Sequence, residues 1–378
     1  MIRKILRLVL CFALILPLAG CWNYKDTDEL SIVVGVAVDF DEKYNRYVLT
    51  HEVADLSGAS DESGISSRIV VTDGQTLFEA VRNAKRKEED KLFFGSPEVL
   101  IISQKFATDY GISEVIEWFI RDAECRETIT VAISQEETAS VILHSAKEDK
   151  GIMALRLNDI IREDNKFTST TIQAQLFQIY NDINSPKRAA VLPAIHRANE
   201  GTMEVSEANG LAILKGDKLV GFLGPHEARY FLMVESMVEG GIMSLSVGDT
   251  VTDDLSIEIL EDKGKKSFSY ENGQFTFHIK IDAKIAISEN QAYLDLTDKK
   301  VIEEIEEKAA EKIKQNVSNV MYALQQEFRT DALGFCDLVY KKDNKLWKQV
   351  ADQWDEIFPK AQFDVETKTK ILSTAFTR

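Results

Sequence analysis

The chain has 378 residues, of which 44% are hydrophobic and 28% are charged, as in ordinary folded proteins. Its formal net charge of −17 argues against a nucleic-acid-binding role, because a strongly acidic body is repelled by phosphate backbones. The length is sufficient for two or three domains with hydrophobic cores of their own.

Residues 1–20 have the pattern of an export signal. Three cations, Arg3, Lys4 and Arg7, precede an apolar run of about nine residues that Pro17 ends, whereas a membrane-spanning helix needs roughly 20 residues. The leader finishes in Leu18-Ala19-Gly20-Cys21, which is similar to the lipobox of bacterial lipoproteins. We therefore expect cleavage between Gly20 and Cys21; a plain secretory signal with an incidental cysteine is the alternative.

After cleavage, Cys21 is expected to carry diacylglycerol through a thioether. Two acyl chains give stable membrane anchoring, so no membrane-spanning helix is required, and no later apolar run is long enough to form one. Residues 21–29 form a short tether, since the eight residues after Cys21 extend at most about 28 Å. Removing 20 of the 378 residues, with their three cations, leaves 358 residues with a net charge of −20. We expect this acidic body to lie close to a lipid bilayer.

Strands and helices alternate through residues 30–198, which favours an N-terminal region with mixed α/β layers. Apolar, β-branched runs predict strands at Leu30–Val38, Arg46–Val53, Val99–Ile102, Ile129–Ser134 and Ala189–Ile195. Helical patterns predict helices from Leu77 to about Lys87, with a capping box at Thr76 and Glu79, and at Ile112–Arg121, Glu137–Ser145 and Thr171–Tyr180.

The pattern weakens into polar residues near 197–203, where we place a domain boundary. Residues 203–378 are then a C-terminal α/β domain, and a further division near residue 250 stays open. A hairpin is predicted at Gly210–Leu223, and residues 275–287 alternate as a long strand with one buried face. Further strands are expected at 255–259 and 363–371.

The clearest helix covers about 28 residues after a cap at Thr297. Its apolar stripe consists of Val301, Ile305, Ala309, Ile313, Val317, Val320 and Leu324. We expect this stripe to pack on a sheet, with a partner-binding or coiled-coil face as the alternative. Together these patterns predict an α+β or mixed α/β fold of two to three successive domains, each a mainly antiparallel or mixed β-sheet flanked by helices.

The search for catalytic or cofactor motifs is negative. The sequence has no glycine-rich phosphate loop, dinucleotide fingerprint, zinc-protease helix or Gly-x-Ser-x-Gly elbow, and its five histidines do not cluster with cysteines. Asp39, Asp41 and Asn45 match a calcium loop poorly and favour a hairpin turn. We therefore expect a non-enzyme without a cofactor or a metal site.

Two cysteines remain outside the leader and its cleavage site. Cys125 and Cys336 are far apart in the sequence and make no disulfide framework. Pairing in an oxidising space stays open, but two small buried hydrophobic side chains are the expected reading.

Several blocks of sequence, in order, resemble the Ger(x)C family of spore germination lipoproteins. They are Gly20-Cys21-Trp22, Glu29–Gly35, Phe94-Gly95, Val99–Ser103, Trp118–Asp122, Leu192-Pro193, Gly210–Gly221, Asp331–Phe335, Trp347, Trp354 and Phe358-Pro359. No single block is diagnostic, but their order covers nearly the whole chain after the leader. The sequence departs from the family pattern at Cys125 and Cys336.

The resemblance implies a non-enzymatic C subunit of a nutrient germinant receptor, supporting assembly and signalling in spore germination. Such a subunit is lipid-anchored on the outer face of the spore inner membrane or the cell membrane, and assembles with integral membrane A and B subunits. Arg121 and Asp122 are our candidate partner contacts, with a buried ion pair at a helix end as the alternative. Trp347 and Trp354 are seven residues apart, a spacing that allows one face of a helix; packing in the core is the expected use.

Two other classes of function stay open. One is a solute-binding lipoprotein of a membrane transporter, which would have a ligand-filled cleft between two lobes. The other is a surface hydrolase whose site is dispersed in the sequence.

Overall fold

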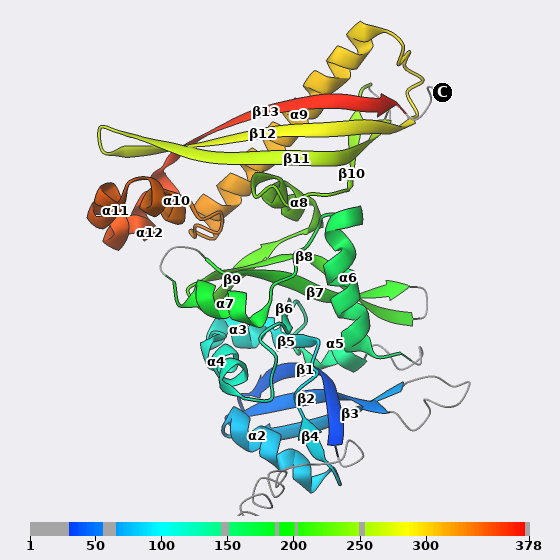
Figure 1. Ribbon diagram of the computed structural model, residues 1–378, viewed down its shortest axis with the longest axis vertical. Helices are drawn as coiled ribbons and strands as arrows, with labels where there is room; N and C mark the ends of the chain where they lie inside the picture. The colour runs from blue at the N-terminus through cyan, green and yellow to red at the C-terminus, as the bar shows by residue number, and fades with distance from the viewer. Residues whose placement is uncertain are drawn as a thin grey trace, which may run out of the picture.

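The computed structural model describes residues 30–55, 66–144, 151–185, 189–200, 203–248 and 254–374. Two β-sheets, each flanked by helices, lie one above the other along the long axis (Figure 1). The predicted mixed α+β fold, with sheets flanked by helices, is confirmed. The expected leader, cleavage site and tether lie outside the described residues.

The first sheet has nine strands and mixed directions. Its order is β3-β2-β1-β5-β6-β7-β8-β9, and β4 pairs with the start of β1. The pairs β1–β5, β5–β6 and β6–β7 at the centre of the sheet are parallel. The pairs on either side of them, β2–β1 and β7–β8, are antiparallel. The strands are β1 (Leu30–Asp41), β2 (Arg46–Asp55), β3 (Ser66–Gly74), β4 (Lys91–Phe93), β5 (Val99–Ser103), β6 (Thr130–Ser134), β7 (Val191–Glu200), β8 (Met203–Lys215) and β9 (Lys218–Leu223).

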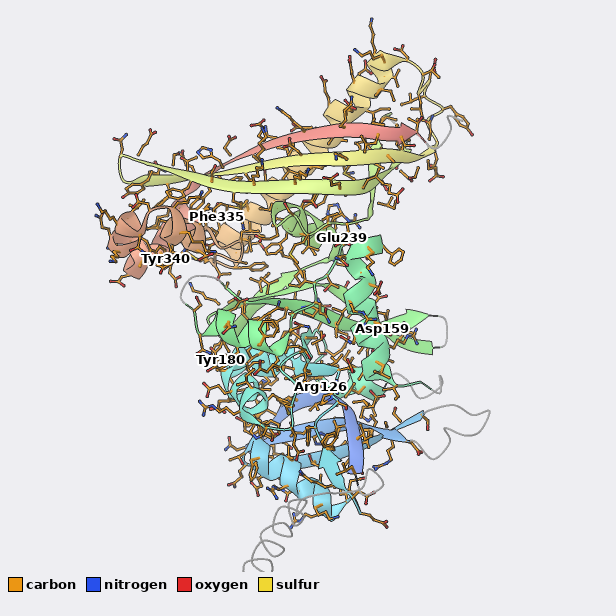
Figure 2. All side chains as sticks on the ribbon, viewed as in Figure 1. Arg126, Asp159, Tyr180, Glu239, Phe335 and Tyr340 are labelled. Carbon is orange, nitrogen blue, oxygen red and sulfur yellow. The ribbon has the colours of Figure 1, made fainter. Side chains whose placement is uncertain are left out.

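Helices cover both faces of this sheet. One layer packs on Leu100, Ile102 and their neighbours, and consists of α2 (Leu77–Asn83), α3 (Gln104–Asp109), α4 (Ser113–Arg121) and α7 (Leu176–Ile183). The other packs on Val99, Ile101 and their neighbours, and consists of α5 (Ser140–His144) and α6 (Met153–Phe167). In Figure 2, Tyr180 marks α7 and Asp159 marks α6. Because successive residues of β5 face opposite layers, all five of its side chains are buried.

Among the described residues, helices cover one face of the second sheet and leave the other open. Its order is β10 (Ile242–Ser246), β11 (Asp254–Glu271), β12 (Gln274–Asn290) and β13 (Gln362–Thr374). Along β12 every second residue from Phe275 to Ile287 is buried against α8 (Pro225–Val234), α9 (Lys299–Tyr322) and the helices that follow. The intervening side chains, such as Lys280 and Lys284, are half-exposed and form ion pairs with neighbouring strands.

Helix α9 is capped by Asp298, whose side chain accepts the amide of Lys300, and not by the predicted cap Thr297. Its buried stripe includes Ile305, Ala309 and Ile313, so the prediction that the stripe packs on a sheet is confirmed. A π-helical turn η4 (Ala323–Glu327) continues the helix. Gln325 in that turn is buried and donates to the carbonyls of Phe358 and Ala361, at 2.8 and 3.0 Å.

The chain between α9 and β13 forms short helices around two tryptophans. They are α10 (Phe335–Lys342), α11 (Asn344–Val350), η5 (Ala351–Gln353), α12 (Trp354–Ile357) and η6 (Phe358–Lys360). Trp347 and Trp354 belong to α11 and α12, so they do not share one face of a single helix, the alternative to core packing. Both are buried, with ring centroids 5.4 Å apart, and their predicted use in the core is confirmed.

The polar segment chosen as a domain boundary lies in a hairpin, since β7 and β8 pair antiparallel from Val191↔Ile213 to Glu200↔Met203. The first sheet therefore continues past the boundary to β9. On β8, Leu211 and Ile213 contact the core of the C-terminal half, whereas Ala212 and Leu214 contact the N-terminal core. Hydrogen bonds between β7 and β8 therefore join the two predicted ranges, 30–198 and 203–378. Their division into separate domains stays a prediction.

Candidate functional site

The carboxylates most deeply buried in the two cores serve the fold. Glu52 accepts the amides of Met153 and Ala154 at the start of α6, at 2.7 and 2.8 Å. Asp39 accepts the amides of Ala139 and Ser140 at the start of α5, at 2.6 and 3.1 Å.

Asp331 plays the same role in the C-terminal half. Its oxygens accept the amides of Phe335 and Cys336 at 3.0 and 2.7 Å, and the indole N–H of Trp354 at 3.2 Å. Burial raises the pKa of Asp39, Glu52 and Asp331 above that of an exposed carboxyl. All three bind helix N-termini, where negative charge is stabilising. Asp39 also lines a cavity of about 210 Å³.

The residues considered as metal ligands or as a disulfide pair are not grouped in the structure. Asp39 lies in the N-terminal core, Asp41 ends β1, and Asn45 belongs to the β1–β2 turn with a φ of +50°. Within the described ranges, no three His, Cys, Asp or Glu side chains are grouped as a metal would require. Cys125 and Cys336 are not joined by a disulfide, and they belong to different cores.

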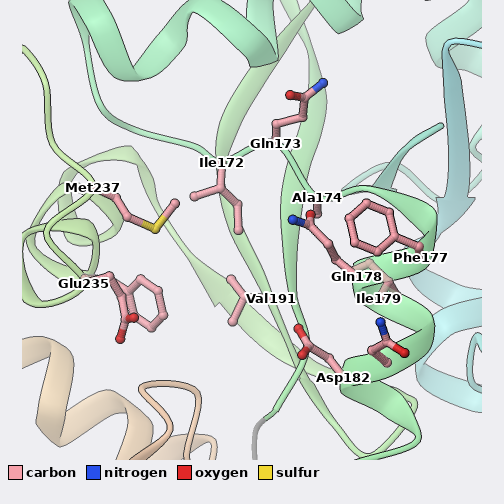
Figure 3. A pocket seen from close by; sticks show the side chains of 12 residues that line it. Ile172, Gln173, Ala174, Phe177, Gln178, Ile179, Asp182, Val191, Glu235 and Met237 are labelled. Carbon is pink, nitrogen blue, oxygen red and sulfur yellow. The ribbon is translucent and has the colours of Figure 1, made fainter. Parts of the chain in front are cut away.

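A crevice lies between the two halves of the chain (Figure 3). Its volume is about 330 Å³; Ile172, Phe177 and Asp182 line one side, and Glu235 and Met237 line the other. Glu235 forms an ion pair with Lys266, which also donates to the carbonyl of Leu333. The charge of Glu235 is therefore already compensated from within the protein.

A second hollow runs between α2 and α4, and we call it the α2–α4 groove. It consists of two adjoining cavities of about 380 and 430 Å³, which share Phe78, Trp118 and Asp122. Phe78 is 53% exposed, with the guanidinium of Arg82 4.8 Å above its ring. Trp118 contacts Phe94 edge-on, with ring centroids 6.0 Å apart. The groove thus presents aromatic rings between charged side chains.

The candidate partner contacts Arg121 and Asp122 both line this groove. The side chain of Arg121 is 74% exposed and pairs with Glu117 at 3.0 Å, so it is not part of a buried ion pair. Asp122 ends α4 and accepts the amide of Glu124 at 2.8 Å. Their role as partner contacts stays a prediction. Sequence reasoning had not identified Phe78 as their neighbour.

The described residues include no helix with the length and apolar character needed to cross a bilayer.

Comparison with known proteins identifies the family. Residues 23–197 match the model "Spore germination protein N-terminal domain", and residues 209–375 match "Spore germination B3/GerAC like, C-terminal". Relatives in Bacillus subtilis (strain 168) include spore germination protein B3, 26% identical over 96% of both chains. Spore germination protein KC is 23% identical over 99% of this chain and 97% of its own. Spore germination protein A3 is 24% identical over 95% of both.

A crystal structure of the GerBC protein has the same fold. It superposes with a TM-score of 0.57 and 22% sequence identity, over 92% of this chain and 100% of that one. The two family models follow each other along the chain and leave only 198–208 between them. The chain therefore belongs to the GerAC family of spore germination proteins.

Proposed function

We propose that this protein is the membrane-anchored lipoprotein subunit of a nutrient germinant receptor, supporting assembly and signalling in spore germination. The observation that carries the proposal is the match of both family models, in order, over residues 23–197 and 209–375. Relatives named as germination proteins B3, KC and A3 align over nearly their whole lengths, which supports the same role for the whole chain.

The proposed anchor is acylated Cys21, on the outer face of the spore inner membrane or the cell membrane. Support comes from the sequence Leu18-Ala19-Gly20-Cys21 and from the start of the first strand at Leu30. With only residues 22–29 between lipid and sheet, the body stands within about 28 Å of the bilayer. The partners we propose are the integral membrane A and B subunits of the receptor.

We propose a binding role without catalysis. The buried carboxylates Asp39, Glu52 and Asp331 accept hydrogen bonds from helix N-termini, so these groups are engaged in holding the fold. A surface hydrolase would be revealed by turnover of ester, peptide or glycoside substrates by the purified protein.

The anchor is tested by Cys21→Ala, with Cys125→Ala as the control. We expect Cys21→Ala to abolish partitioning into the detergent phase, because the acceptor of the acyl chains is lost. Cys125→Ala should partition like the parent. Unchanged partitioning of Cys21→Ala would refute lipid anchoring at this residue.

The receptor role is tested by isolating the lipidated protein from spore membranes and identifying what accompanies it. We expect the two integral membrane subunits, and slower germination toward at least one nutrient when the gene is deleted. Recovery of a transporter permease instead, with normal germination on a broad nutrient panel, would favour the solute-binding alternative.

A further inference from the structure

Residues 235–241 connect α8 to β10, and we call them the interface strap. On one side they meet α6 of the N-terminal half, where the amide of Glu239 donates to the carbonyl of Asn165 at 3.2 Å. A Cβ added to Gly240 would contact the carbonyl of Lys166, so the strap lies directly on the last turn of α6. In Figure 2, Glu239 marks this place.

On its other side the strap is bonded to β11 of the second sheet. The hydroxyl of Ser236 donates to the carbonyl of Gly264 at 3.1 Å and accepts the amide of the same residue at 2.6 Å. The amide of Val238 donates to Oδ1 of Asp262 at 3.0 Å. The strap therefore joins α6 to the second sheet, and one of the bonds that hold it involves an ionisable side chain.

The carboxyl of Asp262 lies where a negative charge is poorly solvated. The residue is 7% exposed, and its Oδ2 has no hydrogen-bond partner within the described ranges. Val238, which bonds to Asp262 from the strap, is only 4% exposed. A buried carboxylate of this kind is costly unless a cation or water reaches it.

The charged groups around Asp262 are engaged elsewhere. Four belong to the open face of the second sheet, where the glutamate pairs with both lysines: Glu261, Lys263, Asp282 and Lys284. From the strap, Glu235 pairs with Lys266, and Glu239 is exposed. Arg229 of α8 donates to backbone carbonyls. Among the described residues, none of these cations forms an ion pair with Asp262.

We propose that ionisation of Asp262 opens the interface strap and loosens the contact between the two halves of the chain. Both oxygens of a carboxylate require hydrogen bonds, and water reaches Oδ2 only when Val238 moves aside with the strap. The bond of Glu239 to α6 is then lost, and the crevice that Glu235 and Met237 line becomes wider (Figure 3).

The direction of the pH dependence follows from the burial of Asp262. Burial raises the pKa of its carboxyl from 3.8 to about 7. The closed strap is therefore fully stabilised below about pH 4, and this stabilisation is lost as the pH rises to about 7. Between these limits the population with an open strap increases up to about tenfold per pH unit, and above about pH 7 it levels off.

Hydrogen–deuterium exchange of the full chain tests the proposal. The exchange rate of the strap, residues 235–241, is divided at each pH by the intrinsic rate of the unfolded peptide. We expect the protection of the strap to fall at least roughly tenfold from pH 5 to pH 7, whereas the protection of residues 275–287 in β12 stays constant. Equal protection of the strap at both pH values would overturn the proposal.

Two variants assign the effect to this carboxyl. Asp262→Asn cannot ionise, so its strap should stay protected at both pH values. Asp295→Asn, which removes an exposed carboxylate, should show the same fall as the parent. The parental pH dependence in Asp262→Asn would overturn the proposal. The measurement depends on neither acylation nor germination, so its failure leaves the proposed function standing.

Discussion

The two sheets of this protein are buried in different ways. The central strands of the first sheet are covered by helices on both faces, and every side chain of β5 and β6 is buried. The second sheet is covered by α8, α9 and α10 on one face, and its other face carries ion pairs such as Lys280–Glu366. In the parallel strands β5 and β6, both faces are covered, so successive side chains do not alternate between buried and exposed. In the antiparallel β11–β12 pair one face is open to solvent, so buried apolar and exposed polar side chains alternate.

This difference in burial also determines which surfaces of each region are accessible to a binding partner. In the first region, contact with another molecule has to come from the outer sides of helices, as at the α2–α4 groove. In the second region the sheet itself is accessible through its charged face. The following predictions test this contrast, from the largest expected effect to the smallest.

Alanine substitutions at neighbouring positions on β5 should lower the free energy of unfolding by similar amounts, whereas those at neighbouring positions on β12 should differ. Ile101→Ala and Ile102→Ala each remove a fully buried side chain from a different core, and each should lower the free energy of unfolding by about 2–5 kcal/mol. Ile281→Ala should cost a similar amount, whereas Lys280→Ala should leave the free energy of unfolding nearly unchanged. Urea unfolding measures all four; a large loss in Lys280→Ala would show that the outer face of β12 is covered.

Asp262 on β11 should make the second region sensitive to pH. Burial raises the pKa of its carboxyl to about 7, although Oδ1 accepts the amide of Val238 at 3.0 Å. An acid whose folded-state pKa is raised stabilises the fold fully below its unfolded value of about 3.8, and this contribution is lost as the pH rises through about 7.

Asp262→Asn should therefore reduce the fall in unfolding free energy between about pH 4 and pH 8. The exposed Asp295 is the control, because hydrogen bonds from Thr297 lower the pKa of its carboxyl. Asp295→Asn should not flatten the profile. An identical slope in the parent and in Asp262→Asn would contradict the assignment.

Arg121→Ala should leave stability nearly unchanged. The residue is exposed and its ion pair with Glu117 spans one helical turn, so the loss of unfolding free energy should be at most about 0.5 kcal/mol. If Arg121 contacts a partner, the same variant should weaken association measured with the intact protein. A loss of about 2 kcal/mol or more in the isolated protein would instead assign Arg121 a structural role.

Strands were the most predictable part of the fold. Alternation identified β12, and apolar runs identified β1, β5 and β6, because these patterns follow directly from burial on one face or two. Helix α6 was missed. It approaches the sheet through small residues, and a Cβ added to Gly35 would lie 2.6 Å from the Cβ of Ala154. Close packing of this kind leaves a weak hydrophobic stripe.

The predicted helix at Thr171–Tyr180 begins only at Leu176, where Gln175 and Gln178 form a capping box. The preceding residues extend beside the sheet, and the amide of Val131 donates to the carbonyl of Ala174 at 2.8 Å. Helix α8 was also missed, although Pro225 stands in its first turn. The segment before Leu176 is extended because it pairs with a strand distant in sequence, and local helix propensity contains no information about such pairing.

The candidate groove was only half visible in the sequence. Arg121 and Asp122 became candidates through the resemblance of Trp118–Asp122 to the family, but Phe78 lies on another helix about 40 residues earlier. Their proximity depends on β1 passing between β2 and β5 in the sheet order. Such neighbours require the topology to be known, because no local pattern encodes them.

Strand β8 has a practical consequence for dissecting the molecule. Its alternate side chains belong to different cores, and Thr330 and Asp331 from the C-terminal half also bond to Leu214 and Ala189 beside it. A protease cut or gene split between residues 198 and 208 would expose the apolar edge of each fragment. We expect the two fragments to aggregate when each is expressed alone and to be soluble when they are co-expressed.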